Sequence, residues 1–204
     1  MKFTIFVLVA VLGLVAVNAN AVGFEDPYPK MEYVPTDLAS GEVDVENFTI
    51  FSSFWWIARA ALKTLKGVNC TIKQVMAIRD AAQNFLPSLQ ACGTDAVNAY
   101  KNVITSAQAV VQTCNTIINI NEEVCNNDVS TDGKTSTPST CFKQLLSQLV
   151  TLNKQIKATK TAIKKVPAVP SDAADCANNA VNDLTSPMTN FASNIKACSK
   201  LTSN

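Results

Sequence analysis

Cysteines recur at a fixed interval along this chain, and that interval constrains the fold more than any other feature. The intervals Cys70–Cys92, Cys92–Cys114 and Cys176–Cys198 are each 22 residues, and three cysteines close the similar tetrapeptides LQAC, VQTC and IKAC. Twenty-two residues rise about 33 Å in a helix, whereas a disulfide needs Cα atoms within about 7 Å. The cysteines therefore predict helix ends rather than pairs within one helix.

Short connections favour antiparallel neighbouring helices, so alternating helices gather the cysteines at two poles. We expect a Cys92–Cys176 bridge at one pole and a Cys125–Cys141 bridge, across a polar loop, at the other. A third pair is drawn from the remaining cysteines of that second pole: Cys70, Cys114 and Cys198. One thiol is left over, either as a buried small side chain or as the link of a disulfide-linked dimer. We favour the buried thiol.

Apolar residues recur every three or four positions through most of the chain, which predicts amphipathic helices. The pattern covers five segments, roughly 51–65, 72–92, 94–117, 142–163 and 173–198. Gly67 is expected to stop the first helix, and Pro87 and Pro187 are expected to kink or break the second and the fifth. No convincing strand pattern occurs. The expected fold is all-α, a disulfide-stapled up-and-down bundle of four or five helices.

The start of the chain has the layout of a secretory signal peptide. A basic residue precedes an apolar run from Phe3 to Val17, and small residues occupy the cleavage-site positions before a cut after Ala21. The run is short for a membrane span, so we expect a secreted, extracellular protein that is not an integral membrane protein. The expected organisation is a signal peptide (1–21), an acidic extended arm (22–46) and a single helical domain (47–204).

Charged residues are balanced in number but segregated along the chain. Of 17 basic residues, 16 remain without Lys2, against 16 acidic ones, and this balance argues against a nucleic-acid partner. Residues 22–46 hold seven acids and one lysine, whereas residues 141–166 hold six lysines and no acid. Lys157, Lys160 and Lys164 share one helical stripe, interpreted by default as a solvated face. The alternatives are an anionic partner or contact with the acidic arm.

Seven cysteines in a secreted chain predict disulfides. Two sequons, at Asn47 and Asn69, are candidate glycosylation sites of the same compartment. The second sequon contains Cys70, so early disulfide formation would compete there with glycan addition.

Three consecutive aromatic residues, Phe54, Trp55 and Trp56, span most of a helical circumference, so one face cannot bury all of them. We expect the core to take Phe54 and Trp55. Trp56 then covers a seam, meets the arm or lines a ligand cavity, and a structural role is favoured over a ligand or membrane-surface role. A ligand carrier would need a cavity of several hundred Å³ lined by Phe54, Trp55, Val103 and Leu149.

The groups on which most enzymes rely are missing. The chain has no histidine, which removes Ser-His-Asp and Cys-His catalysis and the commonest zinc ligand. It has no CxxC and no glycine-rich phosphate loop. Ser193 and Lys196 match Ser-x-x-Lys without its companion motifs. Two acidic pairs are interpreted as surface and helix-start residues rather than acid–base groups: Glu122–Glu123 and Asp172/Asp175. No catalytic residue, metal site or cofactor is expected.

The repeated QxC helix ends, the lack of histidine and the helical pattern resemble the insect family named for the N-terminal domain of the tsetse midgut EP protein (TsetseEP). The resemblance covers roughly Ile57 to Leu201 and rests on cysteine spacing and helical pattern. It implies a small secreted fly protein of a family without a settled biochemical role. We expect an extracellular interaction or structural protein that acts through its surface on an unknown extracellular protein or surface. The alternative is a carrier of a small apolar ligand in an inter-helix cavity.

Overall fold

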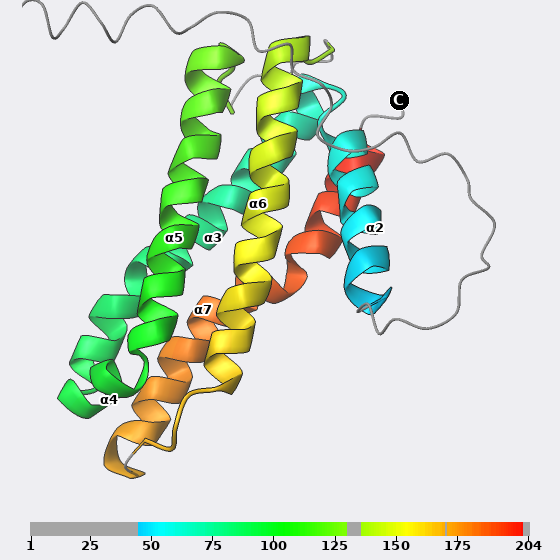
Figure 1. Cartoon of the computed structure of the whole chain (residues 1–204). Helices are drawn as coiled ribbons and strands as arrows, with labels where there is room; N and C mark the ends of the chain where they lie inside the picture. Colours follow the sequence, from blue (N-terminus) through cyan, green and yellow to red (C-terminus); the bar gives the residue numbers. More distant parts are fainter. Residues whose placement is uncertain (1–44, 130–135, 170, 202–204) are drawn as a thin grey trace, which may run out of the picture. The chain divides into compact units, whose positions relative to one another are not determined.

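The computed structural model describes residues 45–129, 136–169 and 171–201 (Figure 1), which belong to one compact unit, Val43–Asn204. The expected signal peptide and nearly all of the expected acidic arm lie outside the described residues. The helices are α2 (Val45–Ala61), α3 (Leu65–Ala91), α4 (Thr94–Ala99), α5 (Lys101–Asn119), the π-helix η1 (Ile120–Val124), α6 (Ser139–Lys164) and α7 (Ser171–Lys200). Across these residues no strand is found, only an isolated bridge between Thr64 and Ser136. The all-α prediction is confirmed.

Helix α3 lies at the centre of the packing, against α7 on one side and α5 on the other. Helix α6 packs on α5, and α2 covers α7 and α6. The colour order in Figure 1 shows the five long helices running in alternating directions. These helices have 17 to 30 residues each, and the expected up-and-down bundle is therefore confirmed.

The core follows the three-and-four spacing of apolar residues. On α5, Val103, Ala107 and Val110 continue into Cys114 and Ile117 as one buried stripe. The largest fully buried side chains come from every long helix except α2. Burying one such side chain contributes about 1.5–3 kcal/mol, so packing of these stripes, rather than helix propensity, stabilises the bundle.

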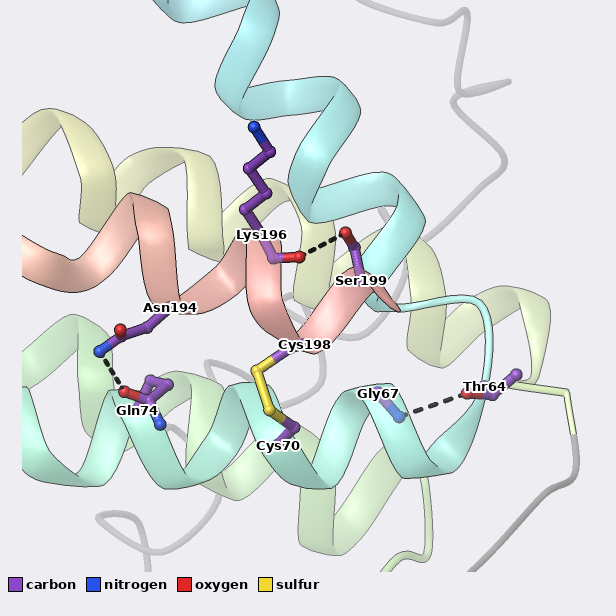
Figure 2. The surroundings of a disulfide bond; sticks show 8 residues. All are labelled: Thr64, Gly67, Cys70, Gln74, Asn194, Lys196, Cys198 and Ser199. Atoms are coloured by element: carbon purple, nitrogen blue, oxygen red, sulfur yellow. Dashed lines mark hydrogen bonds between the residues drawn. A yellow bond between two sulfur atoms is a disulfide. The ribbon is translucent and has the colours of Figure 1, made fainter. Parts of the chain in front are cut away.

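The first helix break was predicted in the wrong place. Gly67 does not stop a helix; it is the third residue of α3. The break lies before Thr64, whose backbone is extended and whose Oγ1 accepts a hydrogen bond of 3.3 Å from Gly67 N (Figure 2). A threonine in this position is a favourable N-cap, so Thr64 starts α3 three residues before the glycine.

Of the kink or break expected at each proline, the break is wrong, because α3 runs through Pro87 and α7 runs through Pro187. Each proline removes one backbone donor, and buried residues on both sides hold the helix against its neighbours. An unpredicted break at Tyr100 separates α4 from α5. The turn before α4 depends on Gly93, whose φ of 101° is rarely adopted by other residues.

Three disulfides close the bundle: Cys92–Cys176, Cys125–Cys141 and Cys70–Cys198. The first two are the pairs that helix-end geometry predicted, and the third takes two of the three cysteines left open. In Figure 2 the Cys70–Cys198 bridge joins α3 to α7, next to a hydrogen bond of 2.7 Å from Asn194 Nδ2 to Gln74 Oε1. Cys114 stays a free thiol inside α5.

Candidate functional site

The three consecutive aromatic residues of α2 have three different environments. Phe54 is buried, and its ring centroid lies 5.7 Å from that of Phe191 on α7. Trp55 is half-buried, and Trp56 is 62% exposed. Trp56 lies about 200° around the helix from Phe54, so it points away from the face that packs. The core therefore takes Phe54 as expected, whereas Trp55, which was also expected there, is only half-buried.

Arg59 holds the two indoles together. Its Cζ lies 5.0 Å from the Trp55 ring centroid and 5.6 Å from that of Trp56. The centroids of the two indole rings are 4.7 Å apart, and the ring planes are nearly perpendicular, at 86°. Each exposed cation–π contact contributes about 0.5–1 kcal/mol. We call Trp55, Trp56 and Arg59 the Trp–Arg surface.

The Trp–Arg surface carries positive charge. Among the described side chains, no carboxylate pairs with Arg59; an ion pair of 2.9 Å joins Arg79 to Asp80 instead. Lys63, which follows α2, is exposed and adds a second positive charge near the end of the helix. A partner for this surface therefore needs an apolar pocket for an indole and an acceptor or carboxylate for the guanidinium.

The residues expected to line a ligand cavity at the aromatic cluster do not line a hollow together. Phe54, Val103 and Leu149 are core residues. Two surface hollows stand out in the part of the chain that the structure describes, and neither is lined by these residues or by Trp55 or Trp56. The smaller hollow, about 360 Å³, lies where the start of α5 meets the end of α6 and includes Asn102 and Lys165.

The larger hollow is a groove of about 620 Å³ between α3 and α5, which we call the α3–α5 groove. Its floor is buried and contains two alanines, its walls are half-buried aliphatic residues, and its rim is exposed and carries three glutamines. The lining residues are Ala82, Gln83, Phe85, Leu86, Pro87, Ile104, Ala107, Gln108, Val111 and Gln112. The small floor residues at Ala82 and Ala107 leave the space that larger side chains would fill.

The lysine stripe of α6 is only partly solvated. Lys157 and Lys160 are half-buried and Lys164 is exposed. Burial lowers the pKa of Lys160, and the neighbouring charge of Lys164 lowers this pKa further. In the described ranges no acidic side chain forms an ion pair with these three lysines. The expected contact with the acidic arm falls outside the described residues.

Asn69 lies in a buried amide cluster that the sequence did not reveal. Asn127 Nδ2 donates hydrogen bonds to Asn69 Oδ1 (2.6 Å) and Asn121 Oδ1 (2.9 Å), and Asn121 Nδ2 donates to the Asn127 carbonyl (2.9 Å). All three residues are buried. A glycan on Asn69 does not fit this folded state. Asn47 lies in the first turn of α2, where side chains are not described. The asparagine-rich stretch around Cys125 was the available sign of this cluster.

Cys114 is the seventh cysteine, and the structure places it in the core with no exposed surface. Burial raises the pKa of its thiol to about 12. A thiolate is the species that forms a disulfide, so Cys114 is neither reachable nor reactive in the folded domain. Of the two interpretations, the structure shows the buried thiol, and it offers no surface thiol for a disulfide-linked dimer.

The weak catalytic candidates whose side chains are described lie on the surface. Ser193 is exposed and donates its hydroxyl hydrogen bond to the Asn190 carbonyl (2.8 Å). In Figure 2 the Lys196 side chain extends away from the Cys70–Cys198 bridge. Glu122, Glu123 and Asp175 are exposed, and the side chain of Asp172 is outside the described set. Within the described ranges no three acidic, cysteine or histidine side chains gather as metal ligands.

No helix in the described part of the chain is long and apolar enough to cross a membrane.

Comparison with known proteins adds no relative. No protein-family model, no curated protein and no solved structure matches this chain.

Proposed function

We propose that this protein is a secreted, non-catalytic interaction protein that binds an extracellular protein through the Trp–Arg surface of α2. The observation that supports this proposal is the exposure of Trp56, 62%, beside a guanidinium that contacts both indoles. Tryptophan and arginine dominate the few residues that supply most of the energy in protein interfaces. A single exposed apolar residue is ordinary, but an indole pair in contact with a guanidinium that no described carboxylate neutralises is not.

The proposed compartment agrees with the disulfides. Six of the seven cysteines are bridged within the chain, and such bridges persist in oxidising compartments. The signal-peptide pattern supports secretion, and the TsetseEP resemblance supports a place among small secreted insect proteins. Secretion and the place among small secreted insect proteins are part of this proposal, together with the role of the surface.

Preorganisation of the Trp–Arg surface favours tight binding. Arg59 restricts the rotamers of two indoles before a partner arrives, so less side-chain entropy is lost on binding. Because Trp56 lies outside the folded core and loses only its exposed contacts with Arg59 and Trp55, its replacement by alanine should change the free energy of unfolding by about 1 kcal/mol. Affinity and stability can therefore be separated at this residue.

The test is capture of partners from the extracellular fluid of the source tissue by immobilised protein. Trp56→Ala should weaken the captured complex by about 30-fold, which corresponds to about 2 kcal/mol for an interface residue of this kind. Lys73→Ala, at an exposed position of α3, is the matched control and should retain full capture. Equal capture by the two variants would reject the proposal, as would binding that occurs only to lipid vesicles.

A second candidate function, carriage of a small apolar ligand, is favoured by one observation. The α3–α5 groove, about 620 Å³, falls in the size range of small-molecule sites and has apolar walls. This candidate is independent of the Trp–Arg surface, because the groove includes no residue of α2.

A further inference from the structure

The α3–α5 groove has a polar feature that its apolar walls do not explain. Pro87 has no backbone N–H, so it cannot donate the helical hydrogen bond to the carbonyl of Gln83 four residues earlier. Gln83 and Pro87 both line the groove. The carbonyl of Gln83 thus lacks its usual helical donor, and because Gln83 and Pro87 are exposed residues of the groove lining, a hydrogen-bond donor from a ligand can replace water there.

The lining also restricts the charge of an occupant. None of the ten lining residues is charged. An ionised head group would lose hydration without gaining a counter-charge, which is unfavourable. The glutamine amides on the rim, Gln108 and Gln112 on α5 opposite Gln83 on α3, offer neutral donors and acceptors instead.

The apolar part of the groove fits a hydrocarbon body. Leu86, Ile104 and Val111 form half-buried walls above a floor of Phe85, Ala82 and Ala107. A volume of about 620 Å³ lies within the usual range of roughly 300–1,000 Å³ for small-molecule sites. The walls and the carbonyl together describe a molecule with an apolar chain and one donor at its end.

We propose that the α3–α5 groove binds a neutral amphiphile, an aliphatic chain with a hydroxyl head, whose hydroxyl donates to the Gln83 carbonyl that Pro87 leaves open. This inference rests on the carrier function and names its ligand class. It makes Pro87 the residue that sets head-group preference, and the aliphatic walls the part that sets affinity for the chain.

The test is displacement of the fluorescent probe N-phenyl-1-naphthylamine from the full-length protein. Three competitors share one decyl chain: 1-decanol, decyl methyl ether, which lacks a donor, and undecanoate, which is charged. We expect 1-decanol to displace the probe at about tenfold lower concentration than either of the others. Equal displacement by 1-decanol and the ether would overturn the head-group inference and leave the carrier function standing. Absence of probe binding would overturn both.

Matched proline variants locate the effect. Pro87→Ala restores an N–H to the helix, suits a helix interior and should remove the tenfold preference for 1-decanol while the probe still binds. Pro187→Ala makes the same change in α7, away from the groove, and should preserve the preference. Ala107→Leu fills the floor and should abolish probe binding, whereas Trp56→Ala should leave it unchanged. A Pro187→Ala effect equal to that of Pro87→Ala would refute the assignment.

Discussion

Removal of the Cys92–Cys176 bridge tests how the chain is stabilised. The change is the double substitution Cys92→Ala/Cys176→Ala. Cys92 is half-buried and Cys176 is exposed, so the substitutions remove few contacts from the folded state. The loss of stability should therefore come mainly from the greater freedom of the unfolded chain.

The magnitude follows from the nesting of two bridges. Cys92–Cys176 spans 84 residues and lies inside Cys70–Cys198, which spans 128. With the outer bridge closed, the inner one divides a ring into loops of 84 and about 44 residues, equivalent to a single loop of about 29 residues. The loop-entropy relation then gives about 3.6 kcal/mol at 25 °C, against about 4.6 kcal/mol for an isolated loop of 84.

The assay is guanidinium unfolding without reductant, followed by circular dichroism at 222 nm. With a slope of about 4 kcal/mol per molar, the midpoint should fall by about 0.9 M. In excess dithiothreitol the variant and the parent should unfold at nearly the same midpoint. A loss below about 1 kcal/mol without reductant would refute the reasoning, since the bridge would then not restrict the unfolded chain as described.

Three further results are expected. Cys114 should resist Ellman's reagent in the native protein and react as one thiol per chain in guanidinium. Because burial raises its pKa from 9.0 to about 12, the folded state keeps a proton that the unfolded state loses above about pH 9. The free energy of unfolding should therefore fall as the pH rises above about 9, and it should fall less in Cys114→Ala. Asn127→Ala should destabilise the domain by about 3 kcal/mol because it removes the buried amide that donates to both Asn69 Oδ1 and Asn121 Oδ1, whereas the exposed control Asn115→Ala should change the free energy of unfolding by less than about 0.5 kcal/mol in the same assay. Glycopeptide mapping of the secreted protein should find Asn69 unmodified, and a glycan on most molecules at that residue would contradict the buried amide cluster.

The features that depend on periodicity were predictable from the sequence. The three-and-four spacing that ends in Ile117 on α5 is the buried stripe of the structure, and it also places Cys114 on the core side. The Cys92–Cys176 pair followed from helix length and alternating direction alone. Both inferences use distances along a helix, which the sequence determines directly.

Features that depend on one side chain or on helix rotation were not predictable. Thr64 starts α3 because its hydroxyl oxygen accepts a hydrogen bond from the backbone N–H of Gly67. This bond outweighed the tendency of Gly67 to stop a helix. The choice of Cys198 over Cys114 as partner of Cys70 depends on the rotation of two helices that both pack against α3. The asparagine cluster required contacts across 58 residues of sequence.

The Trp–Arg surface could be suspected from three consecutive aromatic residues, but its composition could not. The sequence left open which indole would be buried, and Arg59 was not singled out. The cation–π contacts place Arg59 on the same side of α2 as both indoles. Its role depends on the packing of α2 against α7, which fixes the face that stays exposed.

The most direct test of the central claim is photo-cross-linking from position 56. Trp56 is replaced by p-benzoylphenylalanine, which keeps a large aromatic side chain, and the protein is irradiated in the native extracellular fluid. The proposal predicts one dominant protein adduct that is absent when the same group replaces Lys73 on α3 and that disappears with Arg59→Glu. Identical adducts from positions 56 and 73, or no protein adduct at position 56, would contradict the claim that this surface binds a protein partner.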